Sequence, residues 1–197
     1  MLITRLRKKR TKRKRRSNGM KILAVNGSPR KGNSDAMLDV LLGSAREHGA
    51  ETEIVYLREK KLQFCSGGDD CCPVKKECHI KDDMPEIYKK LENAGIIILA
   101  SPCYFFNVTA RMKNFMDRCN PYYFNKRLKG KKFFLLSVGG YEASIKEAIR
   151  AMENFLKGIF AKPIGSYYAV ADKIGEIKEN PKVIKELQNI GKGLTNK

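Results

Sequence analysis

Four of the six cysteines lie within fourteen residues of one another: Cys65, Cys71, Cys72 and Cys78. Four thiolates are the usual ligand set of a 4Fe–4S cluster. Zinc sites normally pair their cysteines as Cys-x2–4-Cys, and this pairing is absent. The spacing therefore favours an iron–sulfur cluster over zinc, while a vicinal disulfide or plain free thiols remain open alternatives.

A second group of polar residues lies in residues 26–34 (NGSPRKGNS), between an apolar run and an amphipathic segment. A helix that follows a buried strand presents free backbone N–H groups and the positive end of its dipole, which together favour an anion. Ser28, Asn33 and Ser34 add neutral donors, and Arg30 adds a positive charge. The loop therefore predicts a phosphate site, although it matches neither Walker A nor Gly-x-Gly-x-x-Gly. An ordinary turn capped by Ser34 is the alternative.

Two further loops carry residues suited to a flat ring. Residues 101–107 contain three adjacent aromatics, from Tyr104 to Phe106. These could form the wall of a site for a planar heterocycle, while Gly139 and Gly140 allow the backbone to approach closely. The alternative is that the aromatics cover the core or an oligomer interface.

The elements that must position these loops alternate along the chain. Continuous apolar runs, typical of buried parallel strands, alternate with segments of helical periodicity. The expected strands are 21–26, 53–57, 95–100, 132–137 and 165–170. This order predicts a parallel sheet covered by helices on both faces, with a ligand beyond the carboxyl ends of its strands.

The charge is strongly positive, with 40 basic and 21 acidic residues and a formal net charge of +19. Residues 1–19 hold ten of the basic residues and no acidic one, which leaves 30 basic and 21 acidic residues in 20–197. We expect a disordered basic tail over 1–19, followed by one domain over 20–197. No apolar run is long enough for a membrane span, and no signal peptide is recognisable, so we expect a cytoplasmic protein.

The quoted segments resemble a known family. Residues 21–34 (KILAVNGSPRKGNS) and 101–118 (SPCYFFNVTARMKNFMDR) resemble the NADPH-dependent FMN reductase superfamily. The cysteine-rich stretch followed by IKDDM (80–84) resembles its iron–sulfur flavoprotein branch. The resemblance implies a flavodoxin-like three-layer sandwich with a five-stranded parallel sheet in the order 2-1-3-4-5. It also implies a Cys-rich insert, residues 58–82, after the second strand, and a homodimer or homotetramer.

The resemblance further implies bound FMN. The residues that would hold it are Ser28, Arg30, Asn33 and Ser34 at the phosphate, Pro102, Cys103, Tyr104, Phe105 and Asn107 along the ribityl chain and ring, and Gly139 and Gly140 on the far side. The branch carries Cys-x2-Cys-x2-Cys and a fourth cysteine. Cys65, Cys71 and Cys78 keep this register, Gly68 occupies the second position, and Cys72 is an extra cysteine.

The sequence therefore predicts an FMN-dependent oxidoreductase that passes electrons between FMN, a 4Fe–4S cluster and an external carrier such as ferredoxin or NAD(P)H. The cofactor carries such chemistry, so no catalytic acid–base pair is required. The alternative is a cluster-free NAD(P)H-dependent flavin or quinone reductase. A nucleic-acid-binding module would explain the basic tail, but residues 20–197 carry no nucleic-acid motif, so we expect no nucleic-acid partner.

Overall fold

A parallel sheet forms the centre of the molecule in the computed structural model, which describes residues 19–67 and 71–196. Five strands run parallel in the order β2-β1-β3-β5-β6. Their bounds are Lys21–Asn26 for β1, Glu51–Tyr56 for β2, Ile96–Tyr104 for β3, Lys132–Gly139 for β5 and Lys162–Val170 for β6. A short strand, β4 (Asn107–Val108), pairs antiparallel with the end of β3. The predicted order of the parallel strands is confirmed, but the predicted number, five, is one too few.

Helices connect the strands. The α-helices are α1 (Asn33–Glu47), α2 (Met84–Asn93), α3 (Ala110–Arg118), α4 (Pro121–Asn125), α5 (Glu142–Gly158) and α6 (Pro181–Thr195). Three shorter helical segments are η1 (Leu57–Glu59), the π-helix η2 (Cys71–Lys75) and η3 (Glu176–Glu179). The predicted insert lies between β2 and α2 and contains η2. The predicted basic tail lies outside the described residues except for Gly19.

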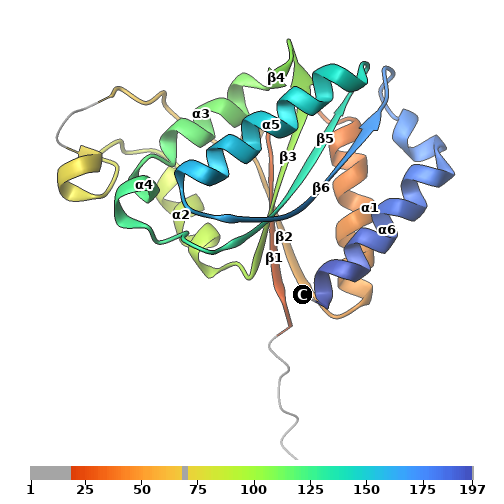
Figure 1. Ribbon diagram of the computed structural model, residues 1–197, viewed down its shortest axis with the longest axis horizontal. Coiled ribbons are helices and arrows are strands. Elements are labelled where there is room, and N and C mark those ends of the chain that lie inside the picture. Colours follow the sequence, from red (N-terminus) through yellow and green to blue (C-terminus); the bar gives the residue numbers. More distant parts are fainter. Residues whose placement is uncertain (1–18, 68–70, 197) are drawn as a thin grey trace, which may run out of the picture.

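Helices cover both faces of the sheet (Figure 1), and an apolar core lies between the sheet and the helices on each face. Met37 and Leu41 of α1 and Leu187 of α6 are fully buried against one face. Met84 of α2 and Met152 of α5 are fully buried in the core on the other face. Each such side chain contributes about 1.5–3 kcal/mol through removal from water, and the two cores together fix the three-layer arrangement.

The covered sheet explains the near-continuous apolar strands. Residues 22–26 of β1 and 96–101 of β3 are buried, because neighbouring strands and both helix layers enclose them. The carboxyl ends of β1, β3, β5 and β6 meet at one edge of the sheet, the upper edge in Figure 1, which we call the C-terminal edge. Among the described helices, none has the length and apolar character needed to cross a membrane.

Candidate functional site at the C-terminal edge

The loop between β1 and α1 is held firmly against the rest of the edge. The Gly27 N–H donates to the Ala100 carbonyl at 2.8 Å, and the Thr109 hydroxyl donates to the Gly27 carbonyl at 2.7 Å. A Cβ at Gly27 would lie 2.7 Å from the Cβ of Met112, so a larger residue would push the loop away from α3. The loop therefore has one fixed position relative to β3 and α3.

The amino end of α1 opens towards the same edge. Gly32 precedes the helix, and no side chain caps its first N–H groups. Ser34 is buried and Arg30 is exposed, and both line the pocket described below. The Ser28 hydroxyl donates to the Arg30 carbonyl at 2.7 Å and so shapes the turn. Uncapped N–H groups beside a guanidinium favour an anion such as phosphate.

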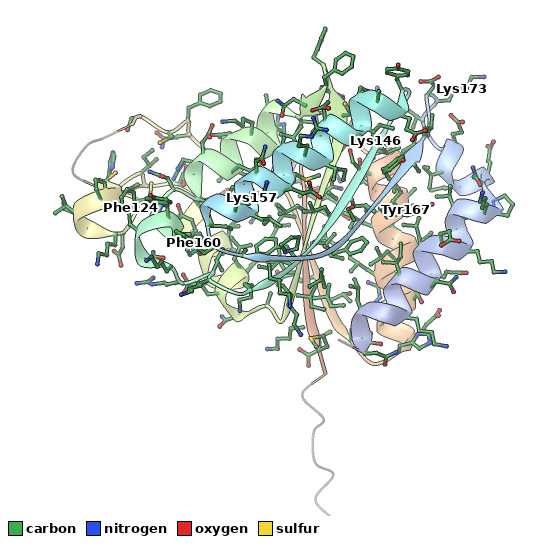
Figure 2. The ribbon with its side chains drawn as sticks, viewed as in Figure 1. Phe124, Lys146, Lys157, Phe160, Tyr167 and Lys173 are labelled. Carbon is green, nitrogen blue, oxygen red and sulfur yellow. The ribbon has the colours of Figure 1, made fainter. Side chains whose placement is uncertain are left out.

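The side chain of Asn33 holds a neighbouring loop. Its Nδ2 donates to the Lys173 carbonyl at 2.8 Å, and its Oδ1 accepts the Gly175 N–H at 3.0 Å. Figure 2 places Lys173 just beyond β6, at the C-terminal edge. Asn33 therefore ties the start of α1 to the loop that follows β6.

The predicted aromatic loop is a hairpin. Strand β3 continues to Tyr104, which pairs with Asn107, and Phe105 and Phe106 form the turn with φ values of 46° and 58°. Left-handed backbone is costly for bulky residues and normally favours Asn or Gly in such turns. Tyr104 lines the pocket, whereas the Phe105 side chain is fully exposed. Phe105 and Asn107 are thus placed at the hairpin tip and outside the pocket lining.

The opposite wall of the pocket is made by glycines. A Cβ at Gly139 would lie 3.1 Å from Ile145 and 3.2 Å from the Cβ of Cys103. A Cβ at Gly140 would lie 1.8 Å from Oδ1 of Asp172. The Cys103 thiol donates to the Ser144 carbonyl at 3.0 Å. The absence of side chains at Gly139 and Gly140 therefore lets the end of β5 and the residue after it pack closely against Cys103, Ile145 and Asp172.

These loops line one pocket, formed by Ser28, Arg30, Gly32, Asn33, Ser34, Pro102, Cys103, Tyr104, Val138, Gly139, Gly140, Ala171, Asp172 and Ile174. Nine of the eleven residues implied by the resemblance are in this lining. Sequence reasoning missed the contribution of Ala171, Asp172 and Ile174 after β6. The signal was present, since this loop also follows a parallel strand, and all such loops lie at one edge.

The lining residues suit a phosphorylated planar group. The uncapped α1 terminus and Arg30 favour an anion, and Tyr104, Gly139 and Gly140 line the same pocket. The buried Asn26 accepts the Ser28 N–H at 2.9 Å, while its Nδ2 has no hydrogen-bond partner among the described residues. At the carboxyl end of β1, the Asn26 Nδ2 is therefore a hydrogen-bond donor that no described residue uses.

The cysteine-rich insert does not gather its described cysteines around one point, unlike the residues that line the pocket at the C-terminal edge. The sulfurs of Cys71 and Cys72 lie 3.6 Å apart, Cys78 is half-buried, and Cys65 is exposed. Burial and contact with Cys71 raise the pKa of Cys72 to about 11, so this group is a neutral thiol without a metal. Within residues 19–67 and 71–196, no three His, Cys, Asp or Glu side chains are arranged to hold a metal ion.

The three-layer fold defines a flavodoxin-like protein, whose pocket at the C-terminal edge has the uncapped α1 terminus and Arg30 in its lining. The sequence profile of the family described as "NADPH-dependent FMN reductase" matches residues 20–175. An iron–sulfur flavoprotein of Archaeoglobus fulgidus is 40% identical over 152 residues, which cover 77% of this chain and 68% of the relative.

Solved structures agree with this fold. An NAD(P)H:quinone oxidoreductase from Methanothermobacter marburgensis has a TM-score of 0.71 at 15% identity, covering 89% of this chain and 99% of that one. A flavodoxin from the domain Archaea has a TM-score of 0.60 at 15% identity, covering 90% and 96%. The chain belongs to the NADPH-dependent FMN reductase family, in its iron–sulfur flavoprotein branch, and is an FMN-dependent oxidoreductase.

Proposed function

We propose that FMN binds in the pocket at the C-terminal edge and exchanges electrons with a 4Fe–4S cluster in the insert. The observation that carries the flavin site is the meeting of four loops, after β1, β3, β5 and β6, around one pocket. FMN, when bound, supplies hydride or two-electron chemistry, and the protein supplies its binding and orientation. An external carrier such as ferredoxin or NAD(P)H would complete the electron path.

The proposed role of each part follows from its position. The free N–H groups at the start of α1 would bind the phosphate, together with Ser28, Arg30, Asn33 and Ser34, which line the same end of the pocket. Pro102, Cys103 and Tyr104 would lie along the ring and ribityl chain, with Gly139 and Gly140 opposite. Phe105 and Asn107 would act from the hairpin tip, where only a large ligand or a second copy of the chain could contact Phe105.

The proposed cluster ligands are Cys65, Cys71, Cys72 and Cys78. Their chemistry suits an iron–sulfur cluster, since four thiolates are its standard donors. Cys72, the extra cysteine beside Cys71, would take the place of the ligand missing at position 68. Because Cys65 is exposed, cluster assembly would require the insert to close around the metal.

A cluster-free NAD(P)H-dependent flavin or quinone reductase is the second candidate. One observation favours it: among the described residues, the cysteine thiols of the insert are not arranged to hold a metal ion together. In that case the insert would be a lid over the flavin rather than a redox centre.

We further propose that the chain assembles as a homodimer or homotetramer through the C-terminal edge. Large apolar side chains there are exposed, with exposed fractions from 43% for Tyr104 to 101% for Phe105; the others are Phe106, Tyr141 and Ile174. A group of exposed apolar side chains in one region commonly marks a surface that binds another protein. A cytoplasmic location and the division into a tail (1–19) and one domain (20–197) stay predictions.

The deciding experiment is an absorption spectrum of anaerobically prepared protein, with iron, sulfide and flavin assays. Flavin bands with about four irons per chain support the electron-transfer function. Flavin bands without iron, even after reconstitution, support the cluster-free reductase. Protein that binds neither group after reconstitution contradicts both candidates.

A further inference from the structure

The outer edge of β6 is an accessible edge strand. The strand order β2-β1-β3-β5-β6 places β5 on one side of β6, and among the described residues no strand pairs with its other side. The strand is nine residues long, Lys162–Val170. An unpaired strand edge presents a row of free backbone N–H and C=O groups, which can pair with another chain.

The pairing with β5 shows which residues of β6 present these groups. The Ala171 N–H, just after β6, donates to the Gly139 carbonyl of β5 at 2.8 Å. Along a regular strand the backbone groups of consecutive residues point to opposite edges, so Ala169 and Tyr167 also face β5. The residues that alternate with these point their N–H and C=O groups away from β5: Ser166, Tyr168 and Val170.

The same part of β6 carries exposed side chains without charge. Ser166 is exposed, and Val170 is 48% exposed although it is apolar. Residues 163–170 contain no charged residue. Proline and an irregular ladder, which usually protect an edge strand, occur at the start of β6, at and beside Pro163. Residues 166–170 are therefore the part of the edge that another strand can approach.

The opposite edge of the sheet differs in charge. Its strand, β2, carries Glu51 and Glu53, which are both exposed. Charged residues on an edge strand oppose pairing with another strand. Glu53 also forms an ion pair with Lys90 of α2 at 2.7 Å. The sheet is therefore protected by charge at β2, whereas residues 166–170 of β6 lack this protection.

The charges favour a second copy of this chain as the partner of β6. Residues 20–197 hold 30 basic and 21 acidic residues, so two copies carry the same net charge and repel each other. An uncharged strip is where this repulsion is smallest. Beside Tyr168, Glu142 and Lys146 form an ion pair at 2.7 Å, so their charges cancel there. A two-fold axis brings a surface against itself, and this strip then meets itself without like charges.

We propose that β6 of one copy pairs antiparallel with β6 of a second copy through residues 166–170, which joins the two sheets into one continuous sheet. This interface differs from the proposed contact at the C-terminal edge and depends on neither a flavin nor a cluster. A homotetramer built from dimers needs two different two-fold interfaces. The β6 pairing and the contact at the C-terminal edge would supply both.

The first test is the oligomeric state of the purified full-length protein in analytical ultracentrifugation. In Val170→Lys a lysine from each copy enters the interface, so the dissociation constant of this contact should rise about a hundredfold, because like charges meet there. Ser166→Pro removes one outward N–H and leaves the bonds to β5 in place, so we expect the same loss. Gln188→Lys is the matched control, since it adds the same charge to the exposed side of α6 and should keep the assembly.

Amide hydrogen exchange distinguishes strand pairing from any other contact made by the same surface. In the assembled wild type we expect slow exchange at the N–H groups of Ser166, Tyr168 and Val170. In Ser166→Pro the N–H groups of Tyr168 and Val170 should exchange fast. The N–H groups of Tyr167 and Ala169 face β5 and should exchange slowly in both proteins.

The outcomes separate this interface from the contact at the C-terminal edge. Phe106→Lys disrupts the latter, because Phe106 is 58% exposed there. If the wild type assembles and both β6 variants keep its size, the β6 interface is overturned, whether or not Phe106→Lys dissociates. If one β6 variant does not fold, the other decides by the same criterion.

Two further results would contradict the proposal. Fast exchange at the outward N–H groups of the assembled wild type overturns the pairing of strands. A wild type that is monomeric at micromolar concentration overturns the β6 interface and the contact at the C-terminal edge together, while the flavin site is unaffected.

Discussion

Thr109 holds the loop between β1 and α1 through the Gly27 carbonyl, and replacing it by valine tests how far the loop depends on this contact. The side chain is 2% exposed. Its hydroxyl donates to the Gly27 carbonyl at 2.7 Å and accepts the Met112 N–H at 3.2 Å, which caps α3. Valine has the same shape and makes neither bond, so the substitution removes the hydrogen bonds without creating a cavity.

The expected loss of stability follows from these two bonds. Loss of an N-cap costs about 1 kcal/mol. A buried carbonyl left without its donor costs about 1–3 kcal/mol. The sum is about 2–4 kcal/mol, and with a slope of about 2 kcal/mol per molar urea the unfolding midpoint falls by about 1–2 M. Because the freed loop carries the proposed phosphate site, FMN should also bind about tenfold more weakly, a change of about 1.4 kcal/mol.

Urea unfolding of the flavin-free protein and fluorescence titration with FMN measure the two effects separately. Thr109→Ser keeps the hydroxyl and should recover most of both losses. Thr195→Val is the matched control, because the exposed Thr195 hydroxyl donates only to the Lys192 carbonyl at the end of α6. Equal midpoints for Thr109→Val and the wild type would show that the hydroxyl does not hold the loop, and the reasoning would fail.

Three more perturbations have expected outcomes. Gly191→Ala should destabilise the protein by about 1–3 kcal/mol in thermal unfolding, since its Cβ would lie 2.2 Å from the Leu41 carbonyl oxygen, whereas Gly193→Ala meets open space and should stabilise α6 by up to about 1 kcal/mol. Burial alone would raise the pKa of Asp82, but its hydrogen bonds lower it overall, so the carboxylate stabilises the fold above its unfolded pKa. This stability is lost as pH falls through the lowered folded value, and Asp82→Asn should flatten that part of the acid-unfolding curve. Phe105→Asn should raise the thermal midpoint, because Asn tolerates the left-handed backbone at φ 46° about 1 kcal/mol better.

The alternation of apolar strands and helices determined most of the fold. Runs such as 21–26 and 95–100 are too uniformly apolar for an exposed strand, so they must be buried between two helix layers. Parallel strands joined by helices place all their carboxyl ends at one edge, and this placed the loops at 26–34 and 101–107 together. The pocket lining confirms that these segments meet.

Other features depended on contacts between segments that local patterns do not connect. The sequence of residues 101–107 does not show that β3 continues to Tyr104, nor that Phe105 points outwards. Both follow from the antiparallel pairing of Tyr104 with Asn107. Asp172 enters the pocket because Asn33 holds the loop after β6 in place.

The meeting of Asp82 with Arg118 is the clearest case. The sequence by itself supplied the local periods, the loop chemistry and the group of cysteines, because these depend on neighbouring residues. The two partners of the ion pair are 36 residues apart, and each alone is an ordinary charged residue of a helical region. Only the packing of α3 against the insert removes both side chains from water, and a buried charge is stable only beside an opposite charge, so tertiary structure alone decided that Arg118 and Asp82 pair.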